Sequence, residues 1–166
     1  MKIAVSAPGY LFRKGLLVLV TRAADDRVQE KEPDGIPVVI QNDVGESPVL
    51  REGIVLIFIG ECDIVRVSDR TEFHVPRMSA REVNVTTGDI SRGELRLRIS
   101  AKPLRIKIAD EQGNPLPSTL IVLVSVKQSH EFTTNGHGEV VVFEEAGAYR
   151  VVVPGHERAT VTLEDL

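Results

Sequence analysis

Two histidines and two glutamates in the last third of the chain are the residues best placed to bind a metal ion. The stretch NGHGE brings His137 close to Glu139, and PGHE brings His156 next to Glu157. His137 and Glu139 are two positions apart, so both would lie on one face of a β-strand. Two imidazoles and a carboxylate could bind zinc if the two turns met. Solvated turn residues are the simpler interpretation, so we predict no metal site and no cofactor.

The other reactive side chains form no catalytic pattern in the sequence. Cys62 is the only cysteine, which excludes an intrachain disulfide and a thiolate metal cage, and its surroundings in IGECDIV indicate a buried thiol. No nucleophile elbow, zinc-protease helix, phosphate-binding loop or dinucleotide-binding fingerprint occurs. The stretch DEQGN lacks the EF-hand spacing. We therefore expect a protein that is not an enzyme.

Tyr10, Phe12 and Arg13, in APGYLFRKG, are the candidate interaction residues. Pro8 and Gly9 end the preceding strand, and two large aromatic side chains then stand beside a guanidinium. Aromatic residues and arginine are enriched at the centres of protein interfaces. Residues 6–15 are therefore expected to form an interaction element rather than a core strand. The alternative is a turn whose aromatic side chains fold back and cap the core.

The elements that must position these residues are almost all β-strands. Short runs of Val, Ile and Leu are separated by Gly, Pro, Asp and Asn, a pattern typical of antiparallel sandwiches and barrels. The polar stretch 23–35 is expected to be a long surface loop or hairpin tip. The expected strands are 2–6, 16–22, 36–41, 54–59, 64–68, 72–75, 82–86, 94–100, 104–109, 119–126, 131–134, 139–143, 149–153 and 159–163.

The apolar patterns also indicate what the strand faces meet. In ELRLRIS, residues 94–100, leucine or isoleucine alternates with arginine, which predicts one buried and one solvated face. GIVLIFIG (53–60) and TLIVLVSV (119–126) do not alternate. Such strands are buried on both faces, or their second face meets another domain or subunit. The pattern alone does not decide between the two.

The stretch SAKP at 100–103 is the expected domain boundary. Pro103 has no N–H to donate and forces Lys102 towards an extended conformation. We divide the chain into residues 1–100, a β domain of no assigned family, and residues 101–166. A continuous bent strand across the proline is the alternative.

Three stretches of the second domain follow one another in a recognisable order: LRIKIADEQGNPLP, FTTNGHGEVVVF and AGAYRVVVPG. Together, residues 104–163 resemble the carboxypeptidase regulatory-like and Cna-B-like domains, which are transthyretin-like β-sandwiches. In the first stretch, Gly113 can adopt the positive φ that the turn needs. The resemblance implies a transthyretin-like or Ig-like sandwich for residues 101–166.

Some Cna-B-like domains carry an isopeptide bond between a lysine of the first strand and an Asn or Asp of the last, promoted by a glutamate. The corresponding positions here hold Arg105 and Val153, which can neither attack nor shuttle a proton. We therefore expect no isopeptide bond and no mass deficit in the intact protein. Lys107, one strand period away, is the only alternative nucleophile.

Charge and composition limit the partners. The net charge is −4, and neither domain has the basic excess that binding to nucleic acid needs. No convincing signal peptide or membrane span is found, since GLLVLV is far too short to cross a bilayer, so we expect a soluble chain of unknown location. Arginine outnumbers lysine by 14 to 6, which is compatible with a thermostable protein.

The sequence therefore predicts an all-β fold of two antiparallel β-sandwich-like units with a non-enzymatic structural or assembly function. Many two-sided apolar strands with few helices to cover them leave edges and faces that docking hides. The expected partner is protein, either copies of the chain or a larger assembly such as an appendage, surface layer or virion. An accessory carbohydrate- or peptide-binding domain is the second hypothesis, and a metal-dependent enzyme the third.

Overall fold

The computed structural model describes all residues of the chain except 22–34, 127–128 and 145–148. The chain divides into two compact units, Met1–Ser100 and Ala101–Leu166, and this division coincides with the one made from Pro103. The mostly-β character is confirmed, since α1 (Thr87–Arg92) is the only helix in the described residues. None of the helical structure described is long and apolar enough to cross a membrane. The stretch 23–35, expected to be a surface loop, lies outside the described residues except for its last one.

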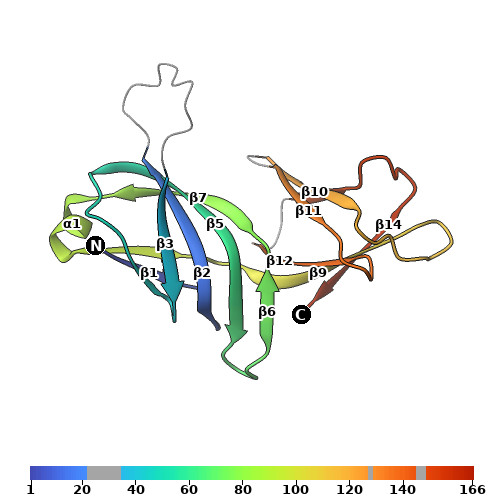
Figure 1. Ribbon diagram of the computed structural model, residues 1–166, viewed down its shortest axis with the longest axis horizontal. Helices are drawn as coiled ribbons and strands as arrows, with labels where there is room; N and C mark the ends of the chain where they lie inside the picture. Colours follow the sequence, from blue (N-terminus) through green and yellow to red (C-terminus); the bar gives the residue numbers. More distant parts are fainter. Residues whose placement is uncertain (22–34, 127–128, 145–148) are drawn as a thin grey trace, which may run out of the picture. The chain divides into compact units, whose positions relative to one another are not determined.

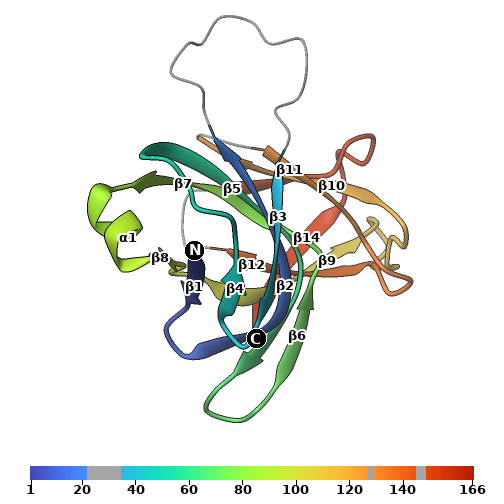
Figure 2. The same cartoon turned by 60° about the vertical axis from the view of Figure 1, so that its left-hand side comes forward.

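Unit 1 is built on one curled sheet of eight strands (Figures 1 and 2). Across the sheet, the order is β6 (Glu72–Val75), β5 (Gly53–Arg66), β2 (Tyr10–Thr21), β3 (Ile36–Gln41), β4 (Val44–Glu46), β1 (Lys2–Ser6) and β8 (Glu94–Arg98), while β7 (Met78–Val85) also pairs with β5. Six of these pairings are antiparallel, but β1 and β8 run parallel.

The expectation of an antiparallel sandwich for residues 1–100 is therefore corrected to a single mixed sheet. The pair responsible joins strands that are far apart in the sequence, with Lys2 opposite Glu94 and Ser6 opposite Arg98. A parallel pair needs a long crossover, and here the rest of unit 1 provides it. Local strand patterns carry no information about such a pairing.

The core of unit 1 lies on the inner face of this sheet. Leu95 and Leu97 of β8 are buried while Arg96 and Arg98 are exposed, which confirms the predicted alternation. Cys62 of β5 is also buried, as predicted from its apolar surroundings. Side chains from five strands are fully buried here: Ile3, Leu19, Val38, Ile40, Ile57, Ile64 and Leu95.

Unit 2 consists of two antiparallel sheets of three strands each. One has the order β11 (Ser129–Thr133), β10 (Leu120–Ser125), β13 (Tyr149–Val152), and the other β12 (Glu139–Glu144), β9 (Lys102–Ala109), β14 (Thr160–Asp165). A single cluster of buried apolar side chains draws on both sheets, from Ile106 and Ile108 of β9 to Ile121 and Leu123 of β10. The two sheets therefore enclose one common core.

The turn after β9 forms as the sequence predicts. The Oδ1 atom of Asp110 accepts hydrogen bonds from the backbone N–H groups of Gln112 and Asn114, each at 2.9 Å. These bonds, that of Asn114 above all, lower the pKa of Asp110. Gly113 has a φ of 83°, the left-handed conformation expected of it. The Asp110 carboxylate therefore stabilises its own turn by accepting these hydrogen bonds.

Candidate interaction surface

The outer face of β5 is apolar and exposed. Val55, Ile57 and Ile59 of this strand are buried in the core. The alternate residues Ile54 and Phe58 are on the other face, where they are 40% and 47% exposed. The sequence left two explanations for the missing alternation of GIVLIFIG. Among the described residues, β5 is buried on one face only, so burial on both faces does not explain the pattern.

The neighbouring strands extend this apolar face. Val18 of β2 lies opposite both Phe58 of β5 and Pro37 of β3. Leu16 pairs with Val39 in the same way, and these two side chains are 41% and 56% exposed. Figure 1 shows the three strands side by side. We call this surface the apolar strip; it consists of Leu16, Val18, Val20, Pro37, Val39, Ile54, Leu56 and Phe58.

Beyond one end of the apolar strip, β2 and β5 carry charged residues of both signs next to His74 of β6. Lys14 of β2 lies opposite Asp63 of β5, which in turn lies opposite His74 of β6. His74 is held between two carboxylates, with its Nδ1 atom 2.7 Å from Asp63 Oδ1 and its Nε2 atom 2.9 Å from Glu61 Oε1. We call Lys14, Glu61, Asp63 and His74 the charged border. It contains two acidic and two basic side chains.

The three residues predicted from the sequence to form an interaction element are not brought together on one surface. Phe12 is 3% exposed and packs in the core of unit 1, where its N–H donates to Asp43 Oδ1 at 2.7 Å. Residues from Tyr10 onwards belong to β2, so the expectation that 6–15 contains no core strand is corrected. The reason is that Gly9, at a φ of 84°, turns the chain tightly enough for pairing to resume at Tyr10.

Tyr10 and Arg13 are both accessible to solvent, but they lie in different surroundings. Arg13 is exposed and forms an ion pair with Glu72 of β6. Tyr10 is partly buried and lines an open hollow of about 450 Å³, together with Pro8, Gly9, Arg66, Val67 and Ser68. An interaction role for Tyr10 and Arg13 stays a prediction.

Arg66 is the charged group of this hollow. Its Nη1 atom donates to Asp69 Oδ2 at 2.9 Å, and its Cζ atom lies 5.1 Å from the centre of the Phe73 ring. The Tyr10 hydroxyl and the Asp69 carboxylate raise the pKa of Arg66. The guanidinium is therefore fixed by its neighbours, and Asp69 already balances its charge.

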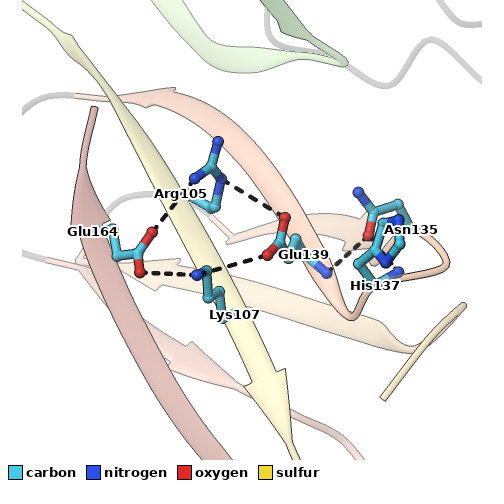
Figure 3. A network of polar contacts seen from close by, with 6 residues as sticks. All are labelled: Arg105, Lys107, Asn135, His137, Glu139 and Glu164. Carbon is cyan, nitrogen blue, oxygen red and sulfur yellow. Dashed lines mark hydrogen bonds and ion pairs between the residues drawn. The ribbon is translucent and has the colours of Figure 1, made fainter. Parts of the chain in front are cut away.

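The outer face of one sheet of unit 2 carries a network of ion pairs (Figure 3). Lys107 Nζ lies 2.9 Å from Glu164 Oε1 and 3.7 Å from Glu139 Oε1. Arg105 approaches the same two glutamates, at 3.5 Å and 3.7 Å. We call these four residues the charged face. Each cation contacts both anions, so the side chains of β9, β12 and β14 neutralise one another.

The charged face includes the two residues weighed as isopeptide nucleophiles. Arg105 is engaged in ion pairs, and the hydrogen bond with Glu164 raises the pKa of Lys107. A raised pKa keeps the amine protonated, and a protonated amine cannot attack a carbonyl. The absence of an isopeptide bond stays a prediction for intact-mass measurement, with a physical reason added.

The residues weighed for zinc are on the surface. His137, His156 and Glu157 are exposed, and Glu139 belongs to the charged face. In the described part of the chain, no three His, Cys, Asp or Glu residues lie so that they could share a metal ion. Burial raises the pKa of the Cys62 thiol to about 12, with Asp63 and Glu61 adding to the shift. At neutral pH this thiol is protonated and inert.

Comparisons with models of protein families, with curated proteins and with solved structures found no match to the chain. The apolar strip is the surface that sequence analysis missed as a whole. Its signal was present in the unbroken apolar run of β5, but the contributions of β2 and β3 depend on strand order and register.

Proposed function

We propose that the chain is a non-enzymatic structural or assembly module that acts through its β-sheet surfaces, by self-association or by docking onto a larger assembly. The observation that carries this proposal is the apolar strip on the outer face of β2, β3 and β5. Single exposed apolar residues are common on soluble proteins, but contiguous apolar patches mark interaction sites. We infer a protein partner, because contiguous apolar patches mark protein contacts and the strip presents no basic group that would bind nucleic-acid phosphate.

Light scattering coupled to size-exclusion chromatography tests the proposal on the untagged full chain. The molar mass should exceed the 18.2 kDa of one chain and should rise with protein concentration. A mass that stays at one chain up to millimolar concentration would exclude self-association, and docking onto another assembly would be the remaining form of the proposal.

For unit 2 we propose the transthyretin-like type of sandwich. Three observations support it: the two three-stranded sheets, the common core and the left-handed turn at Gly113. An experimental structure of residues 101–166 would test the strand order, and an order other than β11-β10-β13 and β12-β9-β14 would contradict this proposal.

An accessory domain that binds carbohydrate or peptide is the second candidate, and the hollow beside Tyr10 favours it. Its lining combines apolar groups of Pro8 and Val67 with the hydroxyl of Tyr10 and the guanidinium of Arg66, which is a composition found in small binding sites. A nuclear magnetic resonance titration with a short proline-rich peptide and with a linear oligosaccharide tests it. Saturable shifts at Tyr10 and Arg66 would support this candidate, and unchanged spectra with both probes would exclude it for those classes.

A further inference from the structure

The apolar strip has the internal order of a sheet face that packs against another sheet. Its rows follow the strand register: Leu16 with Val39, then Val18 between Pro37 and Phe58, then Val20 with Leu56. No charged residue of β2, β3 or β5 interrupts these rows, and the third row ends at the exposed Glu82 of β7, which lies opposite Leu56. Sheets that pack face to face bring such rows together at a spacing of about 10 Å, with interdigitating side chains.

The charged border decides which kind of partner fits. Lys14 supplies a positive charge on β2, and Glu61 and Asp63 supply negative charges on the adjacent β5, with His74 beyond them. A partner surface of one charge sign would meet repulsion either from Lys14 or from Glu61 and Asp63. A surface that itself carries both signs next to an apolar centre can match it, and this chain has such a surface.

We propose that a second copy of this chain covers the apolar strip, with the two strips packed face to face around a two-fold axis. The proposal rests on the proposed function and deepens it, because it names the partner and the surface. In a two-fold contact the same patch serves both subunits, so the patch must be complementary to itself. An uncharged centre meets this condition without desolvating any charge, and the mixed border lets Lys14 of one copy approach carboxylates of the other.

The test places a charge in the strip and, as a control, at an equally exposed apolar residue elsewhere. Phe58→Lys changes the middle row of the strip; Leu163→Lys changes a strand residue of unit 2 that is 51% exposed. Phe58→Lys should weaken self-association by about tenfold or more, because two like charges would meet in a dry contact. Leu163→Lys should leave the association constant unchanged. Light scattering over a concentration series measures both.

The outcomes separate this inference from the proposed function. If the wild-type chain associates and Phe58→Lys associates equally well, the strip is not the contact and this inference is overturned, while self-association stands. If the wild-type chain is monomeric at every concentration, self-association itself fails, and the inference fails with it. Loss of association by both variants would also overturn the inference, since the effect would not be specific to the strip.

A second measurement on the wild-type chain keeps the inference testable even if a variant misfolds. In a sample that mixes isotope-labelled and unlabelled chains, filtered nuclear Overhauser spectra detect only contacts between copies. We expect contacts between the Phe58 ring and the methyl groups of Leu16, Val18 or Val39. Intermolecular contacts that involve only other residues would overturn the inference.

Discussion

The apolar strip of unit 1 and the charged face of unit 2 are the outer faces of two sheets in the same chain, and they are opposite in chemistry. On β9, Arg105 and Lys107 alternate with the buried Ile106 and Ile108. On β5, Ile54, Leu56 and Phe58 alternate in the same way with buried residues. The strand period is identical, so only the outward residues distinguish the two faces.

The difference shows which of the two surfaces is satisfied by its own side chains and by solvent. On the charged face, four partly exposed side chains neutralise one another. Exposed ion pairs add little to stability, but they keep a sheet from docking onto another. The apolar strip has no such protection and gains roughly 25 cal/mol for each Å² of apolar surface that a partner removes from water. The outer face of unit 2 therefore needs no partner in water, whereas the proposed function gives the apolar strip of unit 1 the role of a contact surface.

The largest expected effect comes from two adjacent residues of β5 that point to opposite faces. Ile57→Ala should lower the free energy of unfolding by about 2–5 kcal/mol, because Ile57 is fully buried in the core. Phe58→Ala should change it by less than about 1 kcal/mol, because the ring is half-exposed in the single chain. Urea denaturation at a protein concentration low enough to prevent association measures both.

The same two variants can also contradict the contrast between the apolar strip and the charged face. Equal losses for Ile57→Ala and Phe58→Ala at low concentration would mean that Phe58 is buried within its own chain. The apolar strip would then be an internal contact, and the contrast with the charged face would disappear.

An intermediate effect concerns the independence of unit 2. A fragment of residues 101–166 should fold alone with a stability of only a few kcal/mol, because it has its own core but is near the lower size limit for a domain without disulfides. Glu94–Arg98 pairs with β1 of unit 1, so unit 2 loses no strand in this fragment. Dispersed amide resonances and a cooperative thermal transition are expected; a collapsed amide spectrum would show that unit 2 depends on unit 1.

Most strands could be predicted because their apolar runs are local. Residues 2–6, 36–41 and 72–75 match β1, β3 and β6 at both ends. Two runs expected as separate strands, 54–59 and 64–68, are one long strand, β5, because its pairing with β2 continues past Gly60 through irregular register. The three-residue β4 is too short to give a pattern.

The short helix α1 was also missed, although its capping signal is present in the sequence. Thr86 and Asp89 form a capping box, with the Thr86 Oγ1 atom accepting from the Asp89 N–H at 3.2 Å, and Gly93 ends the helix at a φ of 67°. The helix buries none of its residues, so no apolar periodicity marks it.

The candidate surface was predictable only in part. The missing alternation in 53–60 indicated that β5 has a second apolar face, but joining it to Val39 and Leu16 requires the strand order. Phe12 shows the opposite error: aromatic residues beside arginine favoured an interface, while strand periodicity placed the ring in the core. The composition of a segment does not show to which face of the strand each side chain points. That orientation decides whether a residue lies in the core or on the surface.

The smallest expected effect tests the charged face through its pH dependence. The hydrogen bond from Lys107, and then the charges of Lys107 and Arg105, lower the pKa of Glu164 below its ordinary value of 4.5. Folding thus favours the ionised carboxylate, so its stabilising contribution is present above the ordinary pKa and is lost as the pH falls through the lowered one. Glu164→Gln should remove this part of the acid sensitivity, whereas Glu157→Gln, at an exposed turn position, should keep the wild-type profile. Thermal unfolding from neutral pH to well below 4.5 measures the difference, and added salt should reduce it. If Glu164→Gln has the acid sensitivity of the wild type, the ion pairs do not stabilise unit 2, and the charged face acts only by keeping its sheet hydrated.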